Sequence, residues 1–296
     1  MMKILIPIGI VFILMMFPYL RYGVLHPHLS IPNILKDCWG YIRLKKYNEC
    51  KEYGKIVMFT AADSQAFGSG KTLSMVRWVR SVYHQYNNRE VWDDEKKEFV
   101  KQRIIVISNI QFNDIPCIPF RGKDQFVNLD RLEHNSTDII LFVIDEAGME
   151  FNSRQYKDNL PTDFLVRLLQ VRHNKVSFVM TSQRFLFVDK VLRNTTEVVT
   201  TCKKKWRIVR LQQFDAYDME NCGNANMIRP FATKFYFATD NLFNAYDTTY
   251  NVEKLKQQLT DGELLETKEI LDRIGDNNDP VNATPHIRAR YRRRPK

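Results

Sequence analysis

Residues 65–72, which read QAFGSGKT, carry the residue types that bind phosphate in a P-loop. Small residues at positions 68–70 allow backbone N–H groups to point at phosphate oxygens, Lys71 reaches the terminal phosphates, and the Thr72 hydroxyl suits Mg²⁺. Gln65 stands where the first glycine of the pattern G-x-x-x-x-G-K-[ST] belongs, so the start of the loop lacks a residue that tolerates any φ. We predict that ATP and Mg²⁺ are bound by Gly68, Ser69, Gly70, Lys71, Thr72 and Leu73.

An acidic motif follows farther along the chain, in DIILFVIDEAG (138–148). Its continuous apolar run has the length of a strand buried on both faces, and it ends in two carboxylates. Asp145 would hold Mg²⁺ through water, while Glu146 would act as general base on the attacking water. Taken alone, the segment also fits an ordinary strand followed by an acidic turn. Its combination with the P-loop favours an ATP-hydrolysing site in which Glu146 and Lys71 are catalytic.

The flanking segments predict the elements that would position these residues. Residues 55–61 read as a strand before the loop, and residues 72–86 place apolar side chains on one helical stripe after it. Two more strands are predicted at 103–109 and 175–183. Gln183, at the end of the last strand, is our candidate for a catalytic residue that senses the γ-phosphate, and a Gln that caps the next turn is the alternative.

Alternating strands and helices predict an α/β fold with the ligand at the carboxyl ends of its strands. We expect a P-loop NTPase with a mainly parallel sheet. An additional strand between the Walker A and Walker B strands, with a catalytic glutamate, is the expected subclass.

Composition sets limits on the class of protein. The chain has 296 residues, 44% of them hydrophobic, which suffices for one large domain with extensions. Five cysteines, at 38, 50, 117, 202 and 222, show no metal-binding spacing and are odd in number. We interpret them as reduced thiols in a cytosolic setting.

The N-terminus predicts a membrane anchor. Residues 4–20 carry no charge, and residues 22–25 lengthen this apolar run past Arg21. No small-residue cleavage site follows, which favours an uncleaved anchor over a removed signal peptide. Basic residues are more numerous after the span than before it, so the body of the protein is expected in the cytoplasm. A buried hydrophobic arm used in oligomer contacts is the alternative.

The C-terminus is strongly basic. The formal net charge is +10, from 44 basic and 34 acidic residues, and the tail at 286–296 (HIRARYRRRPK) supplies six of the basic groups. Single-stranded DNA or anionic lipid would suit such a tail, and a solvated end that aids solubility is the alternative. Residues 272–285 before it read as a linker rich in Asn, Asp and Pro.

Two further stretches carry weaker signals. Residues 197–215 read as a hairpin around Lys203 to Lys205 at an edge of the sheet, and residues 88–103 read as an exposed connection of mixed charge. The hairpin could contact DNA, and a solvated edge strand protected by its lysines is the alternative. We assign residues 88–103 no chemistry.

Three segments together resemble a known family. LFVIDEAGMEFNSRQYKD (141–158) looks like the Walker B segment of the zonular occludens toxin family, which includes the gene I assembly ATPases of filamentous phages. NLFNAYDT (241–248) is similar to the segment that closes the ATPase domain of that family, and FVDKVLRN (187–194) is similar to its helix after the sensor strand. The resemblance covers roughly residues 53 to 250.

This resemblance implies a membrane-bound ATPase that drives assembly and export of filamentous virions through the host inner membrane, together with phage coat and assembly proteins. It also implies a ring-shaped homo-oligomer, in which an arginine from a neighbouring subunit completes the site. The sequence does not choose among the candidates, and any of them also suits a surface or salt-bridge role. They are Arg154, Arg167, Arg172 and Arg184.

The expected organisation has four parts. They are an anchor at 1–25, a juxtamembrane connection at 26–52, the ATPase domain at 53–250, and a C-terminal helical or linker segment with the basic tail at 251–296. The better-known family members place their membrane helix after the ATPase domain, so this chain departs from them in having its apolar span first. A DNA-translocating or packaging ATPase of the conjugation or chromosome-pump type is the alternative function.

Overall fold

The structure is a computed structural model, and it describes residues 17–62, 67–129, 132–151, 161–222 and 227–247. The chain divides into two compact units. One comprises residues 1–49 and 90–99, and the other comprises residues 50–89 and 100–296. The larger unit contains the P-loop and both carboxylates of the acidic motif, so it positions the predicted site.

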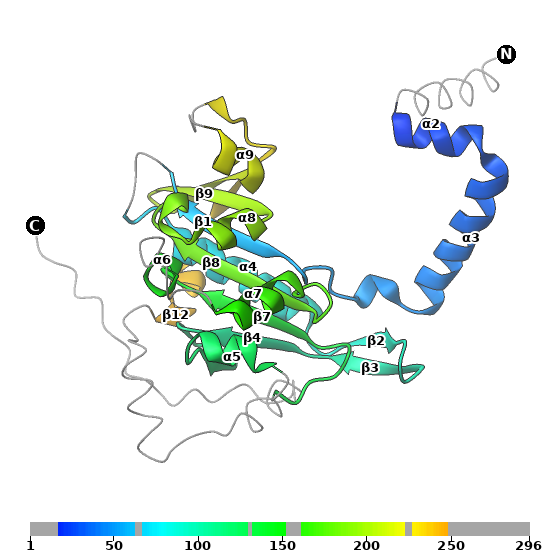
Figure 1. The fold of residues 1–296 in the computed structure, drawn as a ribbon, viewed down its shortest axis with the longest axis horizontal. Coiled ribbons are helices and arrows are strands. Elements are labelled where there is room, and N and C mark those ends of the chain that lie inside the picture. The colour runs from blue at the N-terminus through cyan, green and yellow to red at the C-terminus, as the bar shows by residue number, and fades with distance from the viewer. Residues whose placement is uncertain (1–16, 63–66, 130–131, 152–160, 223–226, 248–296) are drawn as a thin grey trace, which may run out of the picture. The chain divides into compact units, whose positions relative to one another are not determined.

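An eight-stranded sheet forms the centre of the larger unit (Figure 1). Its strand order is β11-β10-β9-β1-β8-β7-β4-β6. The run from β9 to β6 is parallel throughout, whereas β10 is antiparallel to both β9 and β11. The prediction of an α/β fold with a mainly parallel sheet is therefore confirmed. The strands are β1 (Ile56–Ala61), β4 (Ile104–Ser108), β6 (Cys117–Pro119), β7 (Ile139–Ile144), β8 (Val176–Ser182), β9 (Val198–Lys205), β10 (Ile208–Asp215) and β11 (Ala232–Phe237).

The strand β8 lies between β1, which precedes the P-loop, and β7, which ends at the acidic motif. This is the additional strand that the sequence predicts between the two Walker strands. Its register places Val179 beside both Val57 and Val143. The three strands therefore bring their carboxyl ends to one edge of the sheet.

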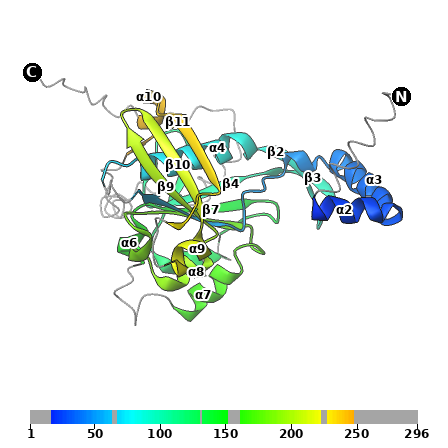
Figure 2. The same cartoon turned by 90° about the horizontal axis from the view of Figure 1, so that it is seen from above.

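Helices cover both faces of the sheet. Figure 2 shows α4 and α10 on one face and α7, α8 and α9 on the other. The predicted helix after the loop is present as α4, which begins at Lys71, and its stripe of Leu73, Val76 and Val79 is buried. The helices are α4 (Lys71–Tyr86), α5 (Lys123–Val127), α6 (Ala147–Glu150), α7 (Thr162–Leu169), α8 (Lys190–Thr195), α9 (Ala216–Asn221) and α10 (Asp240–Phe243), with a 3₁₀ turn η3 (Phe185–Phe187).

A cluster of phenylalanines fills the core between the sheet and α5 and α7. Phe142 of β7 stacks on Phe178 of β8 with ring centroids 5.5 Å apart, and Phe126 of α5 packs edge-on against both. Every residue of β7 and of β8 is buried. The strand β7 is continuously apolar, and β8 is apolar from Phe178 to Met180, because both faces of these strands are covered, which is typical of parallel sheets.

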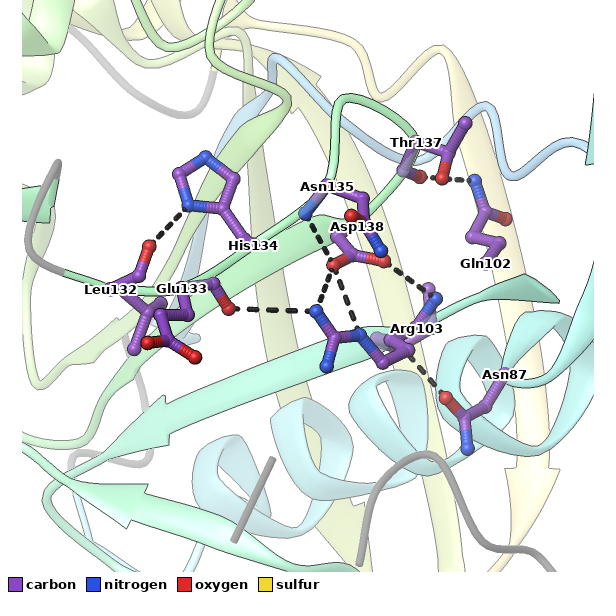
Figure 3. A network of polar contacts seen from close by, with 10 residues as sticks. Asn87, Gln102, Arg103, Leu132, Glu133, His134, Asn135, Thr137 and Asp138 are labelled. Carbon is purple, nitrogen blue, oxygen red and sulfur yellow. Dashed lines mark hydrogen bonds and ion pairs between the residues drawn. The ribbon is translucent and has the colours of Figure 1, made fainter. Parts of the chain in front are cut away.

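A polar network closes the amino ends of β4 and β7 (Figure 3). The Asp138 carboxylate accepts hydrogen bonds from the Arg103 backbone N–H at 3.1 Å, from the Arg103 guanidinium at 2.7 and 3.0 Å, and from the Asn135 N–H at 2.8 Å. The side chain of Asp138 is fully buried, whereas that of Arg103 is 20% exposed. These bonds fix where the two strands begin.

The hairpin predicted at 197–215 is present, formed by β9 and β10. Its turn lies at Trp206 and Arg207, just after the three lysines. The expectation that the hairpin forms an edge of the sheet is wrong, because β11 pairs with β10 over residues 232–237. The edge strand is therefore β11, which follows the hairpin in the chain.

The smaller unit contains α2 (Pro18–Leu25), α3 (Pro27–Arg43) and the 3₁₀ turn η1 (Lys46–Asn48). It also takes in residues 90–99, the tip of a hairpin formed by β2 (Arg89–Asp93) and β3 (Glu98–Gln102). Lys45 forms an ion pair with Glu90 at 2.8 Å, and its ammonium lies 5.1 Å from the Phe99 ring centroid. The predicted connection at 88–103, between α4 and β4, thus contains a pair of strands.

No helix among the described residues is long and apolar enough to cross a membrane. Most of the predicted anchor, residues 1–16, lies outside those residues, as do residues 248–296 with the basic tail. Both predictions therefore stay predictions.

Candidate functional site

Two glycines of the loop before α4 have left-handed backbone angles. Gly68 has φ of 67° and Gly70 has φ of 86°, a left-handed region that other residues rarely adopt. A Cβ on Gly70 would meet the side chains of Lys204 and Val209 at 3.5 and 3.6 Å, which is ordinary contact. The backbone angle rather than a lack of space therefore requires glycine there. Gln65 lies outside the described residues, so its effect stays a prediction.

Polar groups of this loop are available to a phosphate. Ser69 is 1% exposed, and its hydroxyl has no hydrogen-bond partner among the residues that the structure describes. Lys71, 7% exposed, begins α4, whose first turn presents N–H groups without intrahelical acceptors. The Leu73 side chain is buried in the core, so its main-chain N–H is the group available for binding. A phosphate oxygen would give the buried Ser69 hydroxyl the acceptor that it lacks.

The structure joins the P-loop threonine to the acidic motif. The Thr72 hydroxyl lies 2.9 Å from Oδ1 and 3.2 Å from Oδ2 of Asp145. Thr181, at the end of β8, donates its hydroxyl to Oδ1 of the same carboxylate at 2.6 Å. The predicted magnesium ligands Thr72 and Asp145 therefore lie together, although 73 residues separate them in the sequence.

Asn109 holds the backbone of Asp145 in place. Its side-chain amide donates to the Asp145 carbonyl at 2.9 Å, and its side-chain oxygen accepts from the Asp145 N–H at 2.8 Å. Asn109 directly follows β4, so it orients the end of β7 from the neighbouring strand.

Glu146 follows at the turn from β7 into α6. It has φ of 52°, and its N–H donates to the Thr181 hydroxyl at 3.0 Å. Burial raises the pKa of the Glu146 carboxyl above its ordinary value, Lys71 lowers it, and the charge of Asp145 raises it. The direction of the net shift makes the carboxylate a better proton acceptor than an exposed glutamate.

The segment 240–247, which carries most of the NLFNAYDT motif, lies next to this acidic end of β7. Its strand β12 (Tyr246–Asp247) pairs with β5 (Gln111–Phe112), which follows Asn109 closely in the chain. Asn113 adds bonds to the backbone of Asn244 at 2.6 Å and Ala245 at 2.9 Å. Burial raises the pKa of Tyr246 to about 12, with a contribution from the charge of Asp145.

Thr181 and Asn109 both bond to Asp145, and sequence patterns alone point to a role for neither of them. Thr181 and Gln183 stand two positions apart at the end of β8, and the hydroxyl of Thr181 is the one that reaches Asp145. Asn109 ends the segment 103–109, which the sequence predicts only as a strand. A polar residue at the carboxyl end of each predicted parallel strand is the signal that would have found both.

The other residues that the sequence suggests for the site are Gln183 and four arginines, and their positions relative to the P-loop and Asp145 differ. Gln183 directly follows β8 and is partly buried, and its role as a sensor stays a prediction. Arg184 lies next to it and is exposed, whereas Arg172 precedes the amino end of β8 and packs against Gly54. Arg167 lies in α7, and Arg154 lies outside the described residues.

Across the described ranges, no group of three or more His, Cys, Asp or Glu side chains could hold a metal ion. Mg²⁺ usually keeps several waters and is held by one or two carboxylates together with substrate phosphates. Thr72 and Asp145 fit such a partial site.

Comparison with known proteins adds a family match. The profile of the zonular occludens toxin (Zot) family matches residues 66–249. A comparison with curated proteins gives no match.

Several solved structures are distantly similar. The N-terminal domain of zonular occludens toxin from Neisseria meningitidis shares 17% identity at a TM-score of 0.43, over 66% of this chain and 100% of that one. The genome packaging NTPase B204 from Sulfolobus turreted icosahedral virus 2, in complex with ATP-gammaS, shares 12% at a TM-score of 0.40, over 62% and 98%. EssC (ATPases 2 and 3) from Geobacillus thermodenitrificans shares 14% at a TM-score of 0.34, over 75% and 43%.

Proposed function

The chain belongs to the zonular occludens toxin family, and on that premise we propose that it is a membrane-anchored ATPase that powers assembly and export of filamentous phage virions. One observation carries the enzymatic part of the proposal. The P-loop Thr72 and the strand-end Asp145 lie within hydrogen-bond distance, at 2.9 Å, beside a half-buried Glu146. This is the arrangement that a P-loop NTPase uses for Mg²⁺ and for water.

Each part of the loop has a role in binding. The Ser69 hydroxyl and the first-turn N–H groups of α4 would donate hydrogen bonds to phosphate oxygens, and Lys71 would neutralise the charge of the terminal phosphates. Thr72 and Asp145 would hold Mg²⁺, and Thr181 and Asn109 would keep the Asp145 carboxylate oriented. ATP bound with Mg²⁺ supplies the γ-phosphoryl group that is transferred to water.

Glu146 is the proposed general base. Its carboxylate would take the proton from the attacking water, and its N–H bond to Thr181 fixes the backbone from which the side chain projects. Gln183 at the neighbouring strand end is the proposed sensor of the γ-phosphate. Arg184, which is exposed next to it, is the described arginine that we favour for acting on the site of a neighbouring subunit.

The cellular setting is part of the proposal and rests on the sequence. The uncharged residues 4–20 would anchor the chain in the host inner membrane, with the ATPase unit in the cytoplasm. A ring of identical subunits and contacts with phage coat and assembly proteins would complete the motor.

The test is steady-state ATP hydrolysis by the full-length protein in detergent or nanodiscs. Glu146→Gln should lower turnover by about 10²–10⁴-fold while ATP binding survives, because only proton transfer is removed.

Lys71→Ala should weaken ATP binding itself. The matched controls are Glu197→Gln and Lys190→Ala, which change exposed residues outside the site and should leave turnover unchanged.

Equal turnover by the wild type and Glu146→Gln would contradict the assigned base. A wild type that binds ATP without hydrolysing it, under conditions that allow oligomers to form, would contradict the motor and favour a nucleotide-binding scaffold.

The basic tail favours the second candidate function, a DNA-translocating or packaging ATPase. Residues 286–296 hold six basic groups, which suits binding to the backbone of single-stranded DNA. Deletion of these residues should abolish DNA-stimulated hydrolysis if the chain moves DNA through the tail. The same deletion should barely change hydrolysis if the chain is an assembly motor.

A further inference from the structure

The helix α3 has a complete apolar face that no described residue covers. None of its 17 residues is buried. Ile31, Leu35 and Ile42 are 56%, 65% and 68% exposed and lie on one side of the helix, because positions four and seven apart share a face. In α4 the equivalent stripe is packed against the sheet. The apolar residues of α3 are therefore spaced as in a helix that packs on a core, but their side chains are exposed.

Aromatic side chains border this face. Trp39 is 68% exposed and Tyr41 is 41% exposed, on opposite margins of the stripe. Beside them, within the same unit, is a hollow of about 730 Å³ with Trp92 and Phe99 in its lining. Trp and Tyr are the residues that proteins place at the boundary between lipid and water.

The opposite face of α3 and the turn after it are basic. Residues 17–49 contain five basic residues against two acidic ones. Lys36 and Arg43, seven positions apart, lie together on the polar side of the helix, and Lys45 and Lys46 follow its end. Both Lys36 and Arg43 also line the hollow. This charge complements anionic lipid phosphates.

We propose that α3 lies in the plane of an anionic membrane surface, with Ile31, Leu35 and Ile42 in the acyl boundary and Lys36 and Arg43 at the phosphates. A wide apolar face, bordering Trp and Tyr, and a cationic polar face are the features of interfacial helices. The sequence position agrees, because α3 begins shortly after the uncharged residues 4–20. The proposal shares the membrane location with the proposed function and requires neither ATP hydrolysis nor a spanning anchor.

Cys38 offers a probe on the apolar face, since it is exposed and lies between Leu35 and Ile42 along the stripe. The full-length chain with Cys117→Ser and Cys222→Ser would carry an environment-sensitive fluorophore on Cys38, because Cys50 and Cys202 are buried. It would be reconstituted into phosphatidylcholine and phosphatidylglycerol vesicles. Brominated lipids and aqueous iodide would then be compared as quenchers.

We expect brominated lipid to quench the fluorophore at Cys38, with a blue-shifted emission, and iodide to have little effect. The matched control moves the label to the polar face by Cys38→Ser and Asn33→Cys, since Asn33 is exposed there. That label should show the reverse pattern. Vesicles without the anionic lipid should reduce the lipid quenching at Cys38.

Two results would overturn the proposal. Equal iodide quenching at both positions would place the whole helix in water. Shielding of Cys38 from both quenchers would show that a protein surface, such as a second copy of the chain, covers the face.

Extraction with alkaline carbonate separates this proposal from the predicted anchor. Lipid quenching in a protein that carbonate removes from vesicles would support the interfacial helix and contradict the spanning segment. Resistance to carbonate without lipid quenching would support the anchor and contradict the interfacial helix.

Discussion

The strands β4 and β7 have an aspartate network at each end, and the two networks differ in their partners. At the amino ends Arg103 meets Asp138, and at the carboxyl ends Asn109 meets Asp145. Asp138 receives N–H bonds and the charge of a guanidinium. Among the described residues, the Asp145 carboxylate receives bonds from the Thr72 and Thr181 hydroxyls instead.

This difference separates a structural carboxylate from a functional one. A buried aspartate that the protein pairs with its own arginine is satisfied in the folded state. A carboxylate held by hydroxyl groups is oriented without being neutralised, and its charge is available to an external cation. Hydroxyl groups can also switch between donating and accepting, whereas backbone and guanidinium N–H groups can only donate. The two ends of one strand pair should therefore respond differently to the same substitution.

The largest expected effect is on stability, at the amino end. Asp138→Asn should lower the free energy of unfolding by about 3–5 kcal/mol. The new side-chain NH₂ group replaces an oxygen that accepts hydrogen bonds, so two donors would face each other, and Arg103 would lose its counter-charge. Chemical denaturation would measure it. The control Asp163→Asn, at an exposed position in α7, should change the free energy of unfolding by less than about 0.5 kcal/mol. An Asp138→Asn protein of unchanged stability would remove the distinction between the two ends.

A smaller effect is expected on magnesium use, at the carboxyl end. Thr181→Val removes the hydroxyl that bonds Asp145 and should cost about 10–100-fold in Mg²⁺ affinity or hydrolysis. Titration of hydrolysis against Mg²⁺ would show the half-saturating concentration rising. Thr181→Ser keeps the hydroxyl and should stay close to the wild type. If Thr181→Val were equally active at every Mg²⁺ concentration, the hydroxyl would have no part in holding the metal ligand.

The smallest expected effect is the stability change at Asp145. Asp145→Asn should change the free energy of unfolding by less than about 1 kcal/mol, because the Thr72 and Thr181 hydroxyls can adapt to an amide. Hydrolysis should nevertheless be lost, since a magnesium ligand is removed. Denaturation beside Asp138→Asn would measure the contrast. A stability loss as large as that of Asp138→Asn would assign Asp145 a structural role like that of its counterpart.

The central sheet and the nucleotide-binding loop were predictable from the sequence. A strand buried on both faces of a parallel sheet is mostly apolar, so β7 stands out as an uninterrupted apolar run and β8 as an apolar stretch with hydroxyl residues near its ends. The glycines of the loop and the start of α4 at Lys71 follow from the demands of phosphate binding. These features are local, so neighbouring residues suffice to recognise them.

Features that depend on neighbouring strands were not predictable in the same way. Thr181 and Gln183 both end one strand, and only the register of β7 against β8 brings the Thr181 hydroxyl to Asp145. The edge position of β11 likewise depends on its pairing with β10. The exposed face of α3 looks like a core stripe in sequence, and only the packing distinguishes it.

The strand pair β2–β3 has a consequence for how this protein can evolve. The chain passes between its two units at residues 49–50, 89–90 and 99–100. A gene that exchanged the first 49 codons alone would leave Glu90 without Lys45 and without the bond from Asn48. The smaller unit is therefore built from two separate segments of the chain, and an exchange between related genes that carried residues 90–99 along would keep both contacts.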